Sequence, residues 1–538
     1  MWLKSLRKRA YAKDGGLAMT IPGIKTLWRR IPIEALDWAI QVPWLRRAAL
    51  RRGLEELFRF FITDNEENRP LKLQEMRYVC VSNLLQSIEK ALSDGRIGAS
   101  ARKSLLENFV GRVILTENGP VSAFRERYGR EPPSLITISP TKKCNLGCKG
   151  CYAASSAGNL ESLAYPVLKR AIREKTEGWG SHFTVISGGE PLMYVSQGKD
   201  LFDLLAENQD NYFMMYTNGT LITREVADRM ADLGNITPAI SVEGWESETD
   251  GRRGRGVFRR IQDAMENLRS AGVPFGISVT ATRENAETVL SEPFLKFYFE
   301  EQGALYGWIF QYMPIGRGFT TDLMVTAEQR RWMLEQELRL LYEKKWFFVD
   351  FWNGGPMTMG CIAAGRPGGY LYIDWNGNIA PCVFFPYYVD NLYGLYDRGL
   401  GLTDALESRF FQTIRKWQDA YAYRQPPEKV GNLFLPCPIR DHYRFAARTI
   451  ENCGAFPMDE DAGRAVADRD YTERMARYEE ELKEWMDPVW NRIVRQGKGL
   501  EAAEGADLER QGARRTSCPQ ASKCIAAKTD GENAYPSS

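Results

Sequence analysis

The chain has 538 residues, 44% of them hydrophobic and 26% charged, which is ordinary for a soluble protein with two or three domains. Its 71 Lys and Arg nearly balance 69 Asp and Glu, so the net charge of +2 says little about nucleic-acid or acidic partners, and no nucleic-acid partner is expected. No run approaches the roughly 20 apolar residues that cross a bilayer. No apolar signal segment follows the basic N-terminus. The ten cysteines are therefore expected to be metal-bound thiols in a reducing cytoplasm rather than disulfides.

Residues 1–130 are predicted to form a basic, amphipathic and mainly helical region. Residues 1–60 carry thirteen Lys and Arg against five Asp and Glu, a local balance of +8. In WLRRAALRRGLEELFRFF, residues 44–61, apolar side chains recur at helical spacing. Such segments suit an anionic membrane surface, and the alternative is a packed helix with an exposed basic face. The apolar positions are Leu50, Leu54, Leu57, Phe58 and Phe61, and the interfacial tryptophans are Trp2, Trp28, Trp38 and Trp44.

Six short β-rich runs then alternate with helical segments between residues 134 and 318. Each parallel return needs a crossover of a dozen or more residues, so the alternation predicts a parallel sheet. Six units are too few to close an eight-stranded barrel, and we expect an open, partial (β/α)6 barrel whose loops after the strands carry the site. Strands are expected at 134–139, 183–187, 213–217, 238–242, 275–281 and 307–313, with helices around 162–177, 197–207, 223–233, 257–271 and 288–301.

A cysteine triplet follows the first predicted strand. KKCNLGCKGCY, residues 142–152, places Cys144, Cys148 and Cys151 in the spacing C-x3-C-x2-C, which leaves one position of a four-ligand site unfilled. This pattern resembles the radical S-adenosylmethionine (SAM) superfamily. The resemblance implies that three thiolates hold a [4Fe–4S] cluster, and that the amino and carboxylate groups of SAM chelate the fourth iron. A zinc knuckle with a distant fourth ligand is the alternative.

Further residues of this resemblance follow the later strands. The second strand ends in ISGGEPL, where two glycines permit close approach of a ligand and a carboxylate can receive an ammonium group. The resemblance implies that this Gly-Gly-Glu binds the methionyl amine, that the YTNG loop lies near SAM, and that a hydroxyl and a carboxylate hold the ribose. The implied cofactor-binding residues are Tyr152 near the adenine, Gly188, Gly189, Glu190, Asn218, Ser241, Glu243 and, for the SAM carboxylate, Arg252 or Arg253.

Each of these assignments has a structural alternative. The family usually has Asp at the position of Glu243, and the two arginines also fit a solvated basic loop. Tyr152 fits the core equally well. MPIGRG, residues 313–318, resembles the closing segment of the family barrel.

A second cysteine group follows the predicted barrel. Cys361 and Cys382 stand in the pattern C-x15-G-x4-C, and the Asn376-Gly377 dipeptide between them is typical of a two-residue hairpin turn. This resembles the SPASM and twitch extensions, although the dense cysteine run of a full SPASM extension is missing. The resemblance implies one auxiliary [4Fe–4S] cluster, with a role in electron transfer or structural support, and zinc is the alternative. Its implied ligands are Cys361, Cys382, Cys437 and Cys453.

The remaining cysteines and histidines predict no further site. Cys80 lies in a helical stretch and fits a buried small side chain. Cys518 and Cys524 fall in a polar tail and receive no metal. The chain has only two histidines, so histidine-based catalysis has little support, and no catalytic side chain is assigned.

Together these patterns predict an α/β protein with a partial barrel at 131–320, flanked by the N-terminal helical region, an auxiliary-cluster domain at 321–460 and a helix and tail at 461–538. The resemblance implies reductive cleavage of SAM to a 5′-deoxyadenosyl radical that abstracts hydrogen from an unactivated C–H bond, with a ferredoxin- or flavodoxin-type reductant. The N-terminus favours a membrane lipid or isoprenoid substrate and a peripheral membrane location; the SPASM resemblance favours a peptide or protein. A non-catalytic metal–thiolate scaffold is the alternative of another class.

Overall fold

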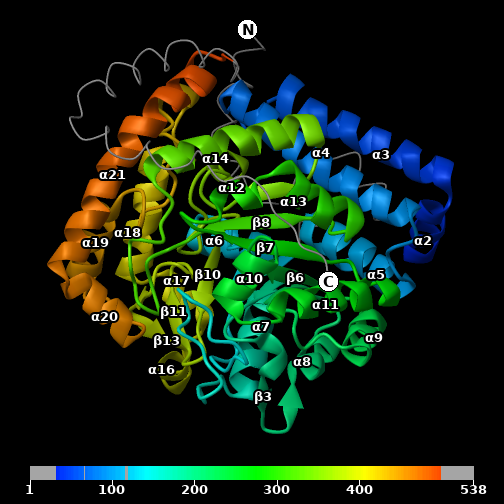
Figure 1. Cartoon of the computed structure of the whole chain (residues 1–538), viewed down its shortest axis with the longest axis horizontal. Coiled ribbons are helices and arrows are strands. Elements are labelled where there is room, and N and C mark those ends of the chain that lie inside the picture. Colours follow the sequence, from blue (N-terminus) through cyan, green and yellow to red (C-terminus); the bar gives the residue numbers. More distant parts are fainter. Residues whose placement is uncertain (1–31, 66, 115–118, 499–538) are drawn as a thin grey trace, which may run out of the picture. The chain divides into compact units, whose positions relative to one another are not determined.

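The computed structural model describes residues 32–65, 67–114 and 119–498 (Figure 1). The described residues up to Trp490 belong to one compact unit, and those from Asn491 belong to a second. Trp2, Trp28, Cys518 and Cys524 lie outside the described residues.

The largest sheet of the described chain has ten strands in the order β13-β11-β10-β1-β2-β5-β6-β7-β8-β9. The eight strands from β10 to β9 pair in parallel, as the alternation of strands and helices predicts. All six expected strands are confirmed. They are β1 (Leu135–Ile138), β2 (Phe183–Ile186), β5 (Tyr212–Thr217), β6 (Ile236–Val242), β7 (Gly276–Ala281) and β8 (Gly307–Gln311).

The region after the six-stranded core adds strands to both edges of the same sheet. β9 (Phe348–Asp350) pairs with β8, and β10 (Tyr370–Ile373) pairs with β1 in the register Leu135 to Tyr370. β11 (Asn378–Ala380) returns antiparallel beside β10, and β13 (Asp390–Asn391) follows it. The predicted hairpin at Asn376-Gly377 therefore exists, and it extends the barrel sheet beside the first strand.

The crossovers are short helices whose ends are fixed by local chemistry. Thr223 caps α9 by accepting a hydrogen bond from the amide of Val226, and Asp200 and Asp203 form a reciprocal capping box at α8. These helices are α7 (Tyr165–Trp179), α8 (Leu201–Glu207), α9 (Arg224–Leu233), α10 (Glu246–Arg253), α11 (Val257–Ala271), α12 (Ala286–Val289), α13 (Glu292–Lys296) and the π-helix η6 (Phe297–Glu301). The short 3-10 helix η5 (Pro191–Met193) and the hairpin of β3 (Val195–Ser196) and β4 (Lys199–Asp200) precede α8.

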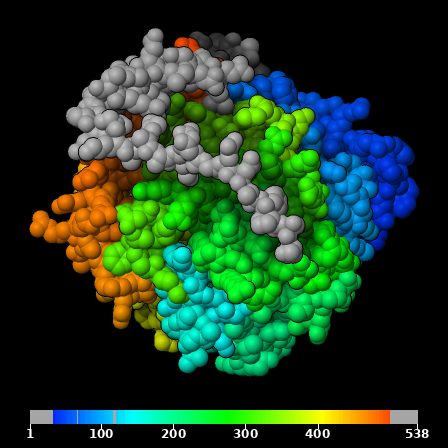
Figure 2. All heavy atoms as spheres, viewed as in Figure 1, coloured from blue at the N-terminus to red at the C-terminus, as the bar shows by residue number. Residues whose placement is uncertain are grey.

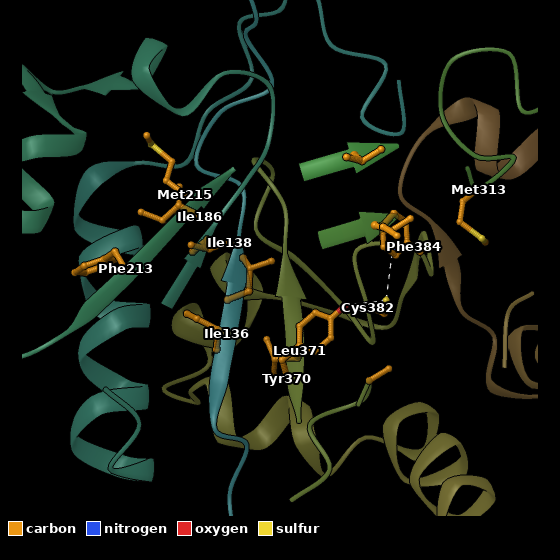
Figure 3. Close-up of a cluster of buried hydrophobic side chains, with 14 of the residues drawn as sticks. Ile136, Ile138, Ile186, Phe213, Met215, Met313, Tyr370, Leu371, Cys382 and Phe384 are labelled. Carbon is orange, nitrogen blue, oxygen red and sulfur yellow. Dashed lines mark hydrogen bonds between the residues drawn. The ribbon is translucent and has the colours of Figure 1, made fainter. Parts of the chain in front are cut away.

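Branched apolar residues on the strands bury one face of the sheet against these helices. Ile136 and Ile138 of β1 are fully buried and lie near Leu371 of the neighbouring β10 (Figure 3). Thr137, between the two isoleucines, projects to the other face of the sheet because side chains alternate along a strand. The same alternation brings polar side chains to the interior of the barrel, where a ligand can contact them.

Helices also precede the barrel and follow it. The preceding ones are α2 (Ile33–Gln41), α3 (Pro43–Phe58), η3 (Arg59–Thr63), α4 (Leu71–Ser93), α5 (Ala99–Ser104), η4 (Leu105–Ile114) and α6 (Gly119–Tyr128). Those that follow are α14 (Ala327–Arg339), η7 (Leu340–Lys344), α15 (Gly355–Thr358), α16 (Leu392–Asp397), α17 (Leu402–Leu406), α18 (Arg409–Gln418), η8 (Asp419–Tyr423), η9 (Pro427–Lys429), α19 (Tyr443–Cys453), α20 (Glu460–Ala467), α21 (Arg469–Trp490) and, in the second unit, η10 (Asn491–Arg495). A small sheet pairs β12 (Tyr387–Tyr388) with β14 (Phe456–Pro457).

The amphipathic segment of residues 44–61 forms α3 and η3, which pack on α4. Leu57 and Phe61 are each only 2% exposed in this contact, whereas Trp44 is 65% exposed and Phe58 is 46% exposed. Both helices of this N-terminal region lie at the surface shown in blue in Figure 2. None of the described helices combines the length and the apolar character needed to span a membrane.

A buried lysine between α7 and the sheet gives a pH-dependent contribution to stability. Lys175 is fully buried, and its ammonium group donates to Asn211 Oδ1 at 2.6 Å and to the carbonyl of Ser181 at 2.8 Å. Burial lowers the pKa of Lys175 from 10.5 to about 7. Between these values the unfolded chain binds a proton that the folded protein does not, so stability rises with pH in this window.

We therefore compare the unfolding free energy of the wild type with that of Lys175→Met. Between a pH of about 7 and about 10, we expect the wild-type value to rise relative to the variant by about 1.4 kcal/mol per pH unit. Denaturant titrations of both proteins at several pH values measure this difference. A gap that stays constant across the window would contradict the lowered pKa of Lys175.

Candidate active site

The cysteine triplet lies in the loop that leaves the carboxyl end of β1. Cys144 is 8% exposed, and Cys148 and Cys151 are half-buried. Burial raises the pKa of the Cys144 thiol to about 12, and the charges of Glu190, Cys148 and Cys151 add to this effect, while the amide of Leu146 opposes it. The structure thus brings the three thiols and Glu190 into one electrostatic neighbourhood. Thiolates this close to one another and to Glu190 would repel, and a positively charged metal centre would offset that repulsion.

The segment after β2 is fastened to the start of the cysteine loop by its backbone. The amide of Gly189 donates to the carbonyl of Thr141 at 2.9 Å, and the amide of Glu190 donates to the carbonyl of Lys143 at 2.8 Å. A Cβ atom at Gly189 would stand 2.2 Å from the carbonyl oxygen of Lys143, so this close approach requires glycine. The two glycines therefore fix the position of the cysteine loop relative to β2.

The carboxylate of Glu190 is fully buried and already accepts three hydrogen bonds. It receives the Thr217 hydroxyl at 2.7 Å, the Asn218 amide at 2.9 Å and the Leu192 amide at 3.2 Å. Burial raises the pKa of Glu190, and these donors oppose the rise. Glu190 therefore ties the end of β2 to the end of β5. A carboxylate offers about four lone-pair positions, so one remains for a further donor.

Asn218 connects this carboxylate to the first cysteine. Its side-chain amide donates to Asn145 Oδ1 at 2.9 Å and lies 3.8 Å from Cys144 Sγ. Its Oδ1 accepts from the amide and hydroxyl of Thr220. Asn218 therefore holds the cysteine loop from the side of β5.

Glu243 and two arginines form a buried charged group after β6. Glu243 is fully buried, and its Oε1 accepts from the guanidinium groups of Arg252 and Arg253, while Oε2 is buried with no hydrogen-bond partner in the structure. Burial lowers the pKa of Arg253, but the charges of Glu243, Cys148 and Cys151 more than offset this, and the net shift is upward. Arg253 is therefore held charged beside the second and third cysteines.

The two remaining predicted residues lie on the same edge of the sheet. Ser241 is half-buried in β6, two residues before Glu243. The Tyr152 hydroxyl lies 2.7 Å from Ser187 Oγ and accepts from the amide of Gly188 at 3.2 Å. Tyr152 therefore supports the glycine pair as well as following the third cysteine.

The MPIGRG segment after β8 fastens the third cysteine. The amide of Arg317 donates to the carbonyl of Cys151 at 3.0 Å, and its guanidinium donates to the carbonyl of Ser155. Gly316 has a φ of +66°, and a Cβ atom there would stand 2.2 Å from the carbonyl oxygen of Tyr152. The side-chain role of Arg317 was not predicted from the sequence, because the contact joins residues far apart in the chain.

The second cysteine group lies beside the added strand β10. The Tyr370 hydroxyl is 2.9 Å from Cys382 Sγ, and the amide of Ala364 donates to the carbonyl of Pro381 at 2.9 Å, which joins the segments around Cys361 and Cys382. The pKa of Cys437 is raised well above its usual value by burial and by the charges of Asp441, Cys361 and Cys382. The structure thus brings three of the four predicted auxiliary ligands together.

The fourth, Cys453, is the last residue of α19, where its Sγ lies 4.0 Å from Thr413 Oγ1 on α18. His442 precedes the same helix, and its Nε2 lies 3.0 Å from the carbonyl of Leu435. Its ring packs against Trp417 and Tyr421.

An aromatic contact connects the two cysteine groups. Phe384 donates from its amide to Cys382 Sγ at 3.4 Å, a bond drawn in Figure 3, and its ring centroid lies 6.2 Å from that of Tyr152. Tyr152 directly follows Cys151. Neither Phe384 nor Tyr370 was predicted as part of a site, because the spacing of the cysteines says nothing about which side chains lie between them.

Comparison with known proteins identifies the family of this chain. Residues 138–291 match the family described as the radical SAM superfamily. This protein is a radical SAM enzyme. The AdoMet-dependent heme synthase of Methanosarcina barkeri is 28% identical over 288 residues, which cover 48% of this chain and 79% of the relative. The mycofactocin maturase MftC of Mycolicibacterium smegmatis is 29% identical over 332 residues, which cover 59% and 79%.

Among solved structures, SuiB of Streptococcus suis bound to the precursor peptide SuiA matches this radical SAM enzyme with a TM-score of 0.45 at 16% identity, over 63% of this chain and 83% of that one.

The donor chemistry around the first cysteine group fits the cofactors of the superfamily, since thiolates are the usual ligands of iron–sulfur clusters and this loop supplies three free thiols. Among the residues described, no group of three or more His, Cys, Asp or Glu side chains is arranged around one metal ion. The half-satisfied carboxylate of Glu243 and the glycine pair at 188 and 189 fit polar groups and close contacts of SAM.

The contact between Gly316 and the backbone that follows Cys151 can be tested by substitution. Alanine at position 316 would have to adopt a left-handed conformation against the Tyr152 carbonyl, so we expect Gly316→Ala to lower the unfolding free energy by roughly 1–3 kcal/mol and to reduce the iron retained after anaerobic reconstitution. Gly147→Ala, in the cysteine loop itself, is the matched control, because its Cβ would meet no atom closer than 3.6 Å. Equal iron retention in both variants would show that the contact of Gly316 with the Tyr152 carbonyl does not position Cys151.

Proposed function

We propose that Cys144, Cys148 and Cys151 hold the SAM-binding [4Fe–4S] cluster of this enzyme, which generates a radical that abstracts hydrogen from an unactivated C–H bond. The arrangement that carries the proposal is the attachment of the cysteine loop to the Gly188-Gly189-Glu190 segment through two backbone hydrogen bonds. When bound and reduced, such a cluster supplies one electron to SAM, which yields methionine and a 5′-deoxyadenosyl radical.

The residues around the triplet have separate tasks in this proposal. Gly188 and Gly189 leave room for the methionyl part of SAM, and the remaining lone pair of Glu190 receives its amine. Arg253 binds the SAM carboxylate. The positive charge of Arg253 is then shared between this carboxylate and Glu243. Oε2 of Glu243, which has no partner in the structure, accepts a hydrogen bond from the ribose. The Ser241 hydroxyl donates a hydrogen bond to the ribose, and Tyr152 lies beside the adenine.

The second cysteine group is proposed to hold an auxiliary iron–sulfur cluster. Arg330 holds the segment of Cys437 in place: its guanidinium donates to both carboxylate oxygens of fully buried Asp441, and Asp441 Oδ2 accepts from the amide of Cys437 at 3.0 Å. A fully paired buried network holds a ligand loop in one conformation. A cluster held by this group would supply electron transfer or structural support, with the ring of Phe384 between the two cysteine groups. We propose a ferredoxin- or flavodoxin-type protein as the external reductant.

Two substrate classes remain for this chemistry, each favoured by a different observation. The maturase MftC matches over 59% of this chain, which favours a peptide or protein substrate. The N-terminal face favours a lipid or isoprenoid taken from an anionic membrane: Trp38, Trp44 and Phe58 are exposed, and a hollow of about 580 Å³ on this face is lined by Arg47 and Arg51, among others.

The described part of that face carries less basic charge than the whole N-terminus. Arg46 is buried and pairs with Glu89 at 3.1 Å, and Arg52 and Arg59 pair with Glu56 of the same helical segment. Eight of the thirteen Lys and Arg in residues 1–60 fall before Ile31, outside the described residues. The lipid alternative therefore depends on those residues together with Arg47 and Arg51.

Removal of a cluster ligand tests the reaction. We expect Cys144→Ala, Cys148→Ala and Cys151→Ala each to abolish formation of 5′-deoxyadenosine from SAM under reducing, anaerobic conditions, because each removes one thiolate of the cluster. Cys80→Ala, a buried thiol outside both groups, is the matched control. Glu190→Ala should weaken SAM binding and leave the iron content nearly intact; loss of iron in that variant would assign Glu190 to the cluster loop alone. Wild-type deoxyadenosine production in any cysteine variant would refute the proposed cluster site.

Sedimentation with vesicles separates the two substrate classes. A basic residue near an anionic surface contributes on the order of 1 kcal/mol, so we expect Arg47→Glu/Arg51→Glu to reduce binding of the full chain to phosphatidylserine vesicles at low salt. The matched control is Arg224→Glu/Arg259→Glu, which reverses two exposed arginines on barrel helices. If the wild-type protein stays in the supernatant, the lipid alternative fails and the peptide alternative is preferred.

A further inference from the structure

The N-terminal helices carry a hollow that the proposed radical chemistry does not use. It has a volume of about 580 Å³ and follows α3 and η3 from Arg47 to Thr63, and Tyr78 of α4 also lines it. At 1.5 Å per residue, this stretch of helix is roughly 24 Å long. The hollow therefore extends along the helix instead of forming a local pit.

An apolar row of side chains lines this hollow. Leu50, Leu54 and Phe58 follow one another at four-residue spacing, so they lie on one face of α3. The two leucines are half-buried, whereas Phe58 is 46% exposed and its ring meets that of Tyr78 edge-on, with 5.4 Å between the centroids. A flat bilayer surface would reach Phe58 but not the recessed leucines. An alkyl chain that lies in the hollow can contact all four side chains.

Two arginines lie beside the apolar row. Arg47 and Arg51 are exposed, stand about one helical turn apart and line the same hollow. Neither guanidinium has an ion-pair or hydrogen-bond partner within the described ranges of the chain. Like charges at this spacing destabilise a helix, and an anion between them would offset the repulsion. A phosphate group fits this task, because guanidinium groups bind its oxygens through paired hydrogen bonds.

The other charged residues of the hollow are already paired. Glu55 lies 3.6 Å from Arg52, and Arg59 lies 3.1 Å from Glu56 on the same helical segment. The half of the hollow toward Thr63 therefore contributes apolar surface and charges that are already balanced.

The hollow is thus cationic at one end and apolar at the other. This asymmetry matches an amphiphile with an anionic head and an apolar chain, whereas an acidic amphipathic helix would carry negative charge along its whole length. Trp44, one turn before Arg47, is 65% exposed at the cationic end. Indole side chains favour the interface between lipid head groups and water, so Trp44 fits the same ligand.

We propose that this hollow binds one anionic lipid molecule, with its phosphate between Arg47 and Arg51 and its acyl chain along Leu54, Phe58 and Tyr78. The bound lipid attaches the N-terminal helices to a membrane whose head groups are anionic. This inference rests on the lipid alternative of the proposed function and adds a binding site that contains none of the cysteines. The site differs from a general electrostatic contact, because a single lipid outside a bilayer is enough to occupy it.

Calorimetric titration of the full chain with monomeric dihexanoyl phosphatidylglycerol tests the cationic end of the site. We expect saturable binding of one lipid per chain, weaker binding of dihexanoyl phosphatidylcholine, and no binding of inorganic phosphate over the same concentrations. Arg47→Gln/Arg51→Gln should weaken binding of the anionic lipid roughly 30-fold, the equivalent of two basic contacts. Arg224→Gln/Arg259→Gln, which changes two exposed arginines on barrel helices, is the matched control.

Three results would overturn the site. They are the absence of saturable lipid binding, equal binding by the wild type and Arg47→Gln/Arg51→Gln, and binding of inorganic phosphate as tight as that of the lipid.

A longer acyl chain tests the apolar end. Dioctanoyl phosphatidylglycerol should bind the wild type more tightly than the dihexanoyl lipid, because the added methylene groups leave water. This gain should shrink in Phe58→Ala, and an equal gain in both proteins would overturn the placement of the chain. If the wild type binds anionic vesicles but not the monomeric lipid, the hollow is not a lipid site, while the lipid alternative of the proposed function stands. Formation of deoxyadenosine tests the cluster separately.

Discussion

The contact between two adjacent backbone segments at the end of β1 and β2 determines most of the site. Parallel pairing of these strands brings the Gly188-Gly189 segment against residues 141–143, where a side chain on Gly189 would collide with a carbonyl. The hydrogen bonds across this contact fix where the cysteine loop begins. Glu190 then carries the constraint to β5, and Asn218 returns it to Cys144. The cysteine positions thus follow from sheet geometry rather than from the loop sequence alone.

The second cysteine group depends on the same sheet. β10 adds to β1 in parallel, so Cys361 and Cys382 are attached to the strand from which the first group departs. A separate domain on a flexible linker would leave the distance between the two cysteine groups variable. A shared sheet, together with the contact between Phe384 and Tyr152, holds that distance constant. This is the arrangement expected if both groups hold clusters, as proposed, and electrons pass between them.

The strands and the first cysteine group could be predicted from the sequence, because both depend on short-range patterns. Runs such as LITI and FTVI fit buried parallel strands, and the spacing of Cys144, Cys148 and Cys151 is itself the signal. The strand β9 was not predicted, and neither was the pairing of the hairpin strand β10 with β1, since these pairing partners are far apart in the chain. The three hydrogen bonds to the Glu190 carboxylate were missed for the same reason, and so was the burial of Arg46 in an ion pair with Glu89.

The four auxiliary ligands were predicted from spacing alone, and the set stays a prediction. The structure brings Cys361, Cys382 and Cys437 together and places Cys453, the last residue of α19, beside Thr413. Spacing does not predict this placement, because the direction of a helix depends on its packing partners.

The central claim is that three thiolates leave one iron of the first cluster open for the methionyl group of SAM. Electron–nuclear double resonance of the reduced enzyme with SAM labelled with ¹⁵N at its amino group tests it most directly. The account predicts a hyperfine coupling between that nitrogen and the cluster in the wild type. A reduced cluster with saturating SAM and no such coupling would contradict it.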